Sequence, residues 1–280
     1  MRRLSARTTR TALATFVLPA LMVTLAATPA AAAAPTIVVA PGVDFPEIAA
    51  CNPDGNGATI PLKIAATQGA TLTGASNNQT LLPAAGITFS TTGGVRSVTL
   101  ATVPGEIGQA DVTLTVSDGA GTATVVIHTF AYGDGNDGTT RDPKFGTLDS
   151  DLMLGRGGND HLVAGTDDTK PPPGSTGRDT LCGGDGNDHL EGQDEEDTVD
   201  GQDGDDLVKG AQGNDIVRGG DGNDQISGRG GADFYSCGTD TVPGDGSGDI
   251  YYGYRANPTN GALPDTSDGS CEDATNGSHK

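Results

Sequence analysis

The sequence has no tryptophan and only 4% aromatic residues, so it lacks most of the large side chains that fill an ordinary protein core. On its own, such a composition favours flexible, solvated chain. Basic residues are also few, with 16 Lys and Arg against 37 Asp and Glu, and the formal net charge is −21. This acidity disfavours nucleic acid or an anionic membrane as a partner and favours multivalent cations.

The common signatures of catalysis are lacking as well. The four histidines form no H-E-x-x-H pair, which separates the chain from metalloproteases of that type. Ser247 lies between two glycines but lacks the spacing of a nucleophile elbow. The long apolar segments that a pore-forming toxin needs are also missing from the sequence after its first residues. We therefore expect a protein that is not an enzyme.

The one long apolar stretch lies at the N-terminus. Residues 1–34 contain four arginines among the first ten residues, continue with an apolar run and end in an alanine tract. This pattern predicts a cleaved secretory signal peptide and an exported, extracellular protein. A retained membrane anchor is the alternative, and Pro19 and the small residues at the end of the run disfavour it. Cleavage removes the four arginines and moves the net charge to about −25. No later stretch is long enough to span a bilayer.

Glycine and aspartate, by contrast, are abundant and occur in a repeat of nine residues. Residues 174–236 divide into seven nonapeptides, each with Gly at the first place, Asp at the sixth and an apolar residue at the eighth. The eighth-place residues are Leu181, Leu190, Val199, Val208, Val217, Ile226 and Tyr235. A unit this short cannot bury its own apolar residue, so successive copies are expected to stack as a solenoid.

Stacking would bring the aspartates of successive coils together. Carboxylates at the spacing of adjacent strands, about 4.8 Å, repel one another and lose solvation, so the stack needs a counterion. Oxygen ligands without His or Cys indicate calcium rather than zinc. The turns contain glycines at the first, second and fourth places, which allow left-handed or crowded backbone.

These blocks resemble the hemolysin-type calcium-binding (RTX) repeats, and the blocks from Gly183 and Gly219 match the pattern G-G-x-G-x-D-x-U-x at every specified place. The resemblance implies a right-handed parallel β-roll with two nonapeptides per coil and several Ca²⁺ ions, each between turns two blocks apart. It implies sixth-place carboxylates as ligands: Asp160, Asp179, Asp188, Asp197, Asp206, Asp215, Asp224 and Asp233. Turn carbonyls would add others, including those of Asp185, Asp203 and Asp221 at the third place.

Some blocks depart from the pattern. Glu195 and Glu196 replace the fourth-place glycine and its neighbour, which weakens the expectation of a site at Asp197. His161 and His189, at the seventh place of their blocks, are expected to be solvated strand residues rather than metal ligands.

Residues 35–131 differ in composition, being rich in Thr, Val, Ala and Gly with apolar residues alternating along short segments. Alternation such as Val112, Leu114, Val116 predicts half-buried strands, and the closely spaced turn signals between such segments suggest an antiparallel sandwich. The segment resembles bacterial Ig-like or cadherin-like modules, which usually act as spacers or adhesive stalks. An adhesin that binds a glycan or a cell surface is therefore the alternative function.

The predicted roll covers residues 132–236. It includes two earlier blocks, from Gly146 and Gly155, and residues 132–137 resemble half of a calcium turn. Residues 164–173 add ten residues where a block would have nine, and we interpret them as a loop leaving one coil. Residues 237–280 are expected to cap the roll.

The cap is expected to use aromatic side chains, with a sugar-stacking platform as the alternative role: Phe234, Tyr235, Tyr251, Tyr252 and Tyr254. Four cysteines in an exported protein favour disulfides. The resemblance to exported RTX-like proteins implies a disulfide between Cys237 and Cys271, which would close the cap. Cys51 and Cys182 remain, and the sequence does not choose among the three connectivities.

Overall fold

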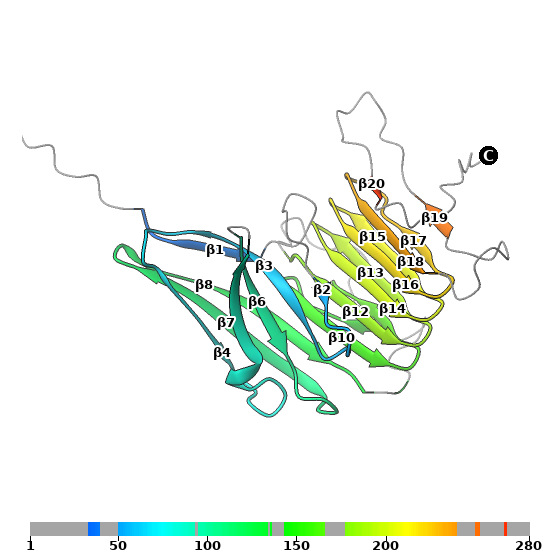
Figure 1. Cartoon of the computed structure of the whole chain (residues 1–280), viewed down its shortest axis with the longest axis horizontal. Coiled ribbons are helices and arrows are strands. Elements are labelled where there is room, and N and C mark those ends of the chain that lie inside the picture. Colours follow the sequence, from blue (N-terminus) through cyan, green and yellow to red (C-terminus); the bar gives the residue numbers. More distant parts are fainter. Residues whose placement is uncertain are drawn as a thin grey trace, which may run out of the picture. The chain divides into compact units, whose positions relative to one another are not determined.

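The computed structural model describes residues 33–39, 50–92, 95–133, 135, 143–165, 177–239, 250–252 and 266–267. Within them the chain is all-β, as predicted, apart from one 3-10 turn at Ala84–Gly86 (Figure 1). Almost all of the predicted signal peptide lies outside these residues. So do parts of the predicted half-turn at 132–137, most of the extra residues 164–173, and Cys271. None of the described residues forms a helix long and apolar enough to cross a membrane.

Two antiparallel sheets form the N-terminal part. In the first, the order is β1 (Thr36–Val39), β3 (Gly57–Ala65), β6 (Val95–Ala101) and β5 (Ile87–Thr92), and β2 (Ala50–Cys51) also pairs with β3. The second contains β4 (Thr71–Ser76), β7 (Gly108–Asp118) and β8 (Gly121–Ala131). Val112, Leu114 and Val116 on β7 are fully buried, as their alternation predicts, and they share one core with residues of the first sheet.

The repeats form two parallel sheets. One contains β10 (Asp151–Gly157), β12 (Thr180–Asp185), β14 (Thr198–Asp203), β16 (Ile216–Asp221), β18 (Phe234–Thr239) and β20 (Thr266–Ser267). The other contains β9 (Lys144–Phe145), β11 (His161–Val163), β13 (His189–Asp194), β15 (Leu207–Gln212), β17 (Gln225–Ser227) and β19 (Ile250–Tyr252). Thr180 pairs with Thr198 and Thr198 with Ile216, so one regular coil is two nonapeptides long.

The core of the roll is a column of eighth-place side chains, all with no exposed surface: Met153, Leu162, Leu181, Leu190, Val199, Val208, Val217, Ile226 and Tyr235. Each nonapeptide contributes one such residue, and neighbouring coils bury it. The stacked core that the nine-residue period predicts is therefore present.

The turns have a repeating backbone conformation that explains many of the glycines. Positive φ recurs at the fourth place of most blocks, as at Gly158 and Gly231, and at the second place of most blocks, as at Gly184 and Gly220. Residues with a side chain adopt it too: Arg156, Gln193, Glu195, Gln202 and Ala211. Glu195 has φ 77°, so the third block keeps the turn despite losing its glycine.

One coil of the roll is longer than the others. Leu152 pairs with Thr180 and His161 with His189, so the partners in this coil are farther apart in sequence than two nonapeptides. All of the extra residues therefore belong to this one coil. The strands before and after them still alternate between the two parallel sheets.

The N-terminal sheets and the roll share a strand. Strand β8 pairs antiparallel with β7 on one side and parallel with β10 on the other, so nine strands form one continuous sheet (Figure 1). Residue 131, where the sequence predicts a domain boundary, is the last residue of β8. Leu152 and Leu154 of β10 face the N-terminal core rather than the core of the roll.

A disulfide also joins the two parts. Cys51 on β2 is bonded to Cys182 on β12, with their Cα atoms 5.8 Å apart. The Gln202 side chain donates to the Asn52 carbonyl at 3.1 Å. The structure therefore decides the pairing that the sequence leaves open.

The roll continues past the last regular block. Strand β18 extends to Thr239, and β19 and β20 add one further strand to each sheet. Tyr251 and Tyr252, predicted to cap the roll, lie on β19. Cys237 is disulfide-bonded and fully buried, while its predicted partner Cys271 lies outside the described residues.

Candidate metal centre

The sixth-place aspartates form two buried columns, one at the start of each parallel sheet's strands. The first column is Asp151, Asp179, Asp197, Asp215 and Asp233; the second is Asp160, Asp188, Asp206 and Asp224. Each of these residues is at most 4% exposed. Aspartate is rarely buried to this degree unless its charge is compensated, so each column concentrates negative charge that needs a partner.

After the first aspartate of each column, one oxygen of every carboxylate is held by a backbone N–H of the preceding coil. The Asp188 N–H donates to Oδ1 of Asp206 at 2.8 Å, and the Asp206 N–H donates to Oδ1 of Asp224 at 2.9 Å. The same bond recurs along the first column, at 2.8 to 3.0 Å from Asp151 to Asp233. These bonds fix the carboxylates in one orientation.

The other oxygen, Oδ2, lacks a hydrogen-bond donor at most internal positions. At Asp188, Asp197, Asp206 and Asp215 it is buried, and no donor among the described residues reaches it. Burying a polar oxygen without a donor costs about 1–3 kcal/mol, and burying an ionised oxygen costs more. The columns thus contain buried acceptor oxygens for which the described residues provide no hydrogen-bond donor.

The first-place glycine makes room for this oxygen. A Cβ added at Gly183 would collide with Oδ2 of Asp188 and lie 2.6 Å from the carbonyl oxygen of Gly201. At Gly201 the same clashes would involve Asp206 and Gly219. A carboxylate oxygen and a backbone carbonyl oxygen therefore face the same small space in successive coils.

The chemistry of this space fits calcium. All the groups that converge there are oxygens, and Ca²⁺ takes six to eight oxygen ligands from carboxylates and carbonyls. The third-place residues Asp185, Asp203 and Asp221 have exposed side chains. Their carbonyls each accept one N–H from the preceding coil, at 2.7 to 2.8 Å. Since a carbonyl oxygen has two lone pairs, such a group can accept this N–H and still coordinate a metal.

Burial raises the pKa values of these carboxyl groups. It raises the pKa of Asp188 and Asp206 to about 7 and that of Asp215 to about 8, and neighbouring carboxylates add to the effect. The pKa values of Asp179 and Asp197 are also raised well above the usual value, for the same two reasons. Without a cation, the ionised columns are therefore unfavourable near neutral pH.

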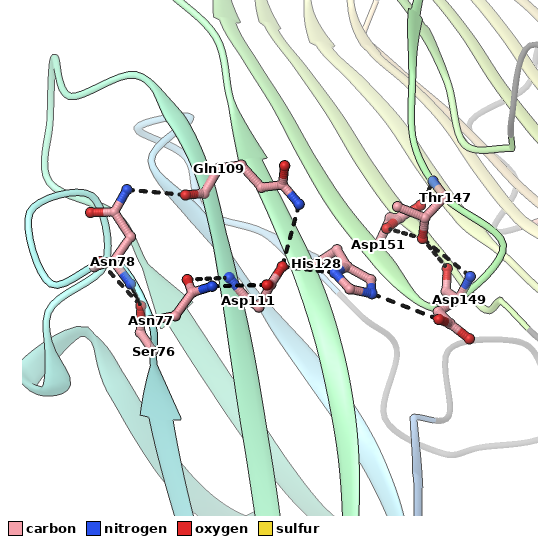
Figure 2. A network of polar contacts seen from close by, with 9 residues as sticks. All are labelled: Ser76, Asn77, Asn78, Gln109, Asp111, His128, Thr147, Asp149 and Asp151. Carbon is pink, nitrogen blue, oxygen red and sulfur yellow. Dashed lines mark hydrogen bonds and ion pairs between the residues drawn. The ribbon is translucent and has the colours of Figure 1, made fainter.

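Neutral protein donors reach the first and the last described carboxylates of the first column. At its start, the Thr147 N–H donates to Oδ2 of Asp151 at 2.6 Å, and Thr147 Oγ1 donates to Oδ1 at 2.9 Å (Figure 2). At its end, the Tyr235 hydroxyl donates to Oδ2 of Asp233 at 3.1 Å. The terminal carboxylates are thus satisfied without an ion.

A polar network fastens the start of the first column to the N-terminal sheet. Figure 2 shows His128 on β8 between Asp111 of β7 and Asp149, with ring nitrogens 2.8 Å and 3.7 Å from their carboxylates. Asn77 exchanges two further hydrogen bonds with Asp111, both 2.8 Å. Asp149 follows Thr147 closely in the chain, so this network positions the first turn of the roll.

The structure brings together the eight predicted sixth-place aspartates, and it adds contacts that sequence reasoning missed. Asp151 is a ninth member, and the in-phase block from Gly146 already indicated its place. The long coil places Asp160 next to Asp188 and Asp151 next to Asp179. The first-place carbonyls of Gly201 and Gly219 are further candidate ligands that no side-chain pattern could reveal.

Comparison with known proteins agrees with this geometry. Residues 145–168, 173–208 and 200–235 match the family described as RTX calcium-binding nonapeptide repeat (4 copies). The matched segments coincide with the strands and turns that build the two columns. The comparisons with curated proteins and with solved structures found no match. Residues 145–168 and 173–235 are therefore similar to RTX calcium-binding repeats, and those of them that the structure describes form a parallel β-roll.

Proposed function

We propose that this is an exported, non-enzymatic protein whose roll completes its folding when Ca²⁺ binds along the two aspartate columns. The observation that carries the proposal is the set of buried Oδ2 atoms without donors at Asp188, Asp197, Asp206 and Asp215. A bound divalent cation supplies the positive charge that lets neighbouring carboxylates stay ionised at strand spacing. Because the columns form only when the coils stack, the free energy of binding contributes directly to folding.

The residues that would hold the ions are the sixth-place aspartates of both columns, with turn carbonyls beside them. The backbone N–H groups orient each carboxylate through Oδ1, and the first-place glycines keep the space beside Oδ2 open. Several ions are expected, since each column has several internal rungs. Asp151 and Asp233 are expected to contribute least, because Thr147 and Tyr235 already satisfy them.

Export is supported by the N-terminal leader pattern and by the disulfide. A disulfide such as Cys51–Cys182 persists in oxidising compartments and is rare in the cytosol. Extracellular calcium modules commonly have Kd values of about 10⁻⁴ to 10⁻³ M. Calcium outside a cell would then order a roll that stays loose before export.

The flanking parts have supporting roles in this proposal. The N-terminal sheets act as an Ig-like spacer, and they cover the first coil of the roll through β8 and the disulfide. At the other end, Cys237 and Cys271 close a cap over the last coil. The spacer role follows from the resemblance to Ig-like modules, and the closed cap follows from the resemblance to exported RTX-like proteins.

Circular dichroism of the mature chain, residues 35–280, tests the proposal. We expect a gain of β signal when calcium replaces chelator, and a cooperative titration with more than one ion per chain by calorimetry. A spectrum and a thermal transition identical in calcium and in chelator would contradict it. The whole mature chain is the appropriate sample, because β8 belongs to both parts.

The alternative is a calcium-stiffened adhesin whose N-terminal sheets or C-terminal tyrosines bind a glycan or a cell surface. A glycan array probed with the calcium-loaded mature chain separates the two roles. Saturable binding to a defined glycan would favour the adhesin, whereas a calcium module alone should retain none.

A further inference from the structure

The outer face of the second parallel sheet holds a cluster of nitrogen and oxygen ligands apart from the aspartate columns. His161 on β11 pairs in register with His189 on β13, and Glu191 lies two residues after His189 on the same face of that strand. The ligand atoms of these three residues all lie within 4.8 Å of one another. His161 and His189 are one long coil apart in the sequence, so completing this coil places them side by side on neighbouring strands.

The two histidines are held close by the parallel ladder. Their rings stack at 4.1 Å between centroids with an interplanar angle of 8°. His189 Nε2 lies 2.9 Å from a carboxylate oxygen of Glu191. The seventh-place and ninth-place residues point away from the eighth-place core of the roll. His161 is nevertheless only 8% exposed, so the expectation that it is a solvated residue is wrong, and solvent reaches the cluster at His189 and Glu191. The side chains of His189 and Glu191 are 20% and 30% exposed, which leaves them accessible to an ion.

A cation already lies against two members of the cluster, His189 and Glu191. The ammonium group of Lys209, on the neighbouring strand β15, lies 2.7 Å from His189 Nε2 and 2.7 Å from Glu191 Oε1. The ammonium can donate to both of these acceptors, the imidazole nitrogen and the carboxylate oxygen. The lone pairs of the imidazole and the carboxylate thus converge on one position that favours positive charge.

We propose that His161, His189 and Glu191 form a second metal site, selective for a borderline divalent transition metal such as Zn²⁺ and separate from the calcium columns. Two imidazoles and one carboxylate are a ligand set that zinc accepts, with an open position left for water. Calcium prefers oxygen ligands only, so the two kinds of site divide the ions by ligand chemistry. Lys209 acts as an internal competitor that the metal displaces.

The neighbouring rungs restrict the site to this one place. The residue that follows His189 in the seventh-place ladder is Leu207, and those flanking Glu191 in the ninth-place ladder are Val163 and Lys209. None of these supplies a further imidazole or carboxylate. We therefore expect one zinc ion per chain.

Calorimetric titration with ZnCl₂ of the mature chain, saturated with calcium, tests this site. We expect one zinc ion per chain, and at least a tenfold weaker affinity in His189→Gln and in His161→Gln. Lys209→Met should bind at least threefold more tightly, because it removes the competing ammonium. His128→Gln is the matched control, since that histidine lies in the polar network of Figure 2, and it should leave the zinc affinity unchanged.

Other outcomes would overturn the site. These are the absence of zinc binding, or binding that His189→Gln and Lys209→Met both leave unchanged, as expected if zinc enters the aspartate columns instead. Should the histidine variants fail to fold, the increase expected for Lys209→Met still decides the question. Failure here leaves the calcium proposal untouched, because calcium saturation is measured first in the same samples.

Discussion

At the scale of single residues, the roll depends on aspartates in which Oδ1 accepts a backbone N–H while the buried Oδ2 has no hydrogen-bond donor. The Asp206→Asn substitution tests this arrangement directly. The amide oxygen can still accept the Asp188 N–H, while the new NH₂ group would face the Gly219 carbonyl beside Gly201. We expect the variant to bind less calcium. In chelator, by contrast, it should be more stable than the parent by about 1–3 kcal/mol, because a buried unpaired charge has been removed.

The control for this variant is Asp205→Asn, which removes the same charge from the adjacent, exposed residue. Asp205 accepts the Asn223 N–H through Oδ1, and an amide oxygen can do the same. Its calcium stoichiometry and its unfolding free energy in chelator should stay close to those of the parent. If Asp206→Asn destabilised the chelator-treated protein instead, the unsatisfied-oxygen argument would be wrong.

The raised pKa values also predict how pH acts on the metal-free protein. Asp188 and Asp206 have folded pKa values of about 7, above the value of about 4 expected in an unfolded chain. Between these two values the folded state binds more protons than the unfolded state, so its stability rises as pH falls. Denaturant unfolding in chelator should therefore show greater stability near pH 5 than near pH 7.5. Greater stability at the higher pH would count against buried, uncompensated columns.

At the scale of turns and strands, side chains at left-handed positions mark where the roll is strained. Ala211 has φ 86° at the second place of its block, where the blocks from Gly183 and Gly219 have glycine. A residue with a Cβ is disfavoured there by about 1–2 kcal/mol. Ala211→Gly should thus stabilise the calcium-loaded protein by about 1 kcal/mol, measured by denaturant unfolding, after the extra entropy of glycine in the unfolded chain is included.

Ala232→Gly is the control, because Ala232 lies in a turn of the same roll without a positive φ. It should destabilise the protein slightly, since only the unfolded chain gains freedom. Equal effects of the two substitutions would mean that the left-handed position stores no strain.

Some features of the turns and strands could be predicted from the sequence, and others could not. The nine-residue period predicts the coil, the eighth-place core and the sixth-place columns, because each depends only on local spacing. It does not predict that Thr147 and Tyr235 donate to the first and last described carboxylates of the first column, since neither residue type is specified by the repeat pattern. The His161–His189 contact was missed for a similar reason: the extra residues of the long coil hide the pairing of their strands.

At the scale of the whole molecule, strands from two segments of different sequence pattern, residues 35–131 and the nonapeptide repeats, form one continuous sheet. The alternation up to residue 131 and the nine-residue period after it carry no sign that β8 pairs with β10. Pairing between distant segments is set by tertiary packing, here by Leu152 and Leu154 facing the N-terminal core. The pairing of Cys51 with Cys182 follows from this contact and closes a loop with a sequence separation of 131 residues. Such a loop contributes about 5 kcal/mol in the chain-entropy model.

This continuity predicts that calcium stabilises more than the roll. Because β8 contributes to both parts and the disulfide spans them, we expect the mature chain to unfold in one calorimetric transition whose midpoint rises with calcium concentration. The Cys51→Ala/Cys182→Ala double variant should separate this into two transitions, of which only one responds strongly to calcium. Two transitions in the intact, oxidised chain, with one insensitive to calcium, would show instead that the shared strand does not couple the two parts.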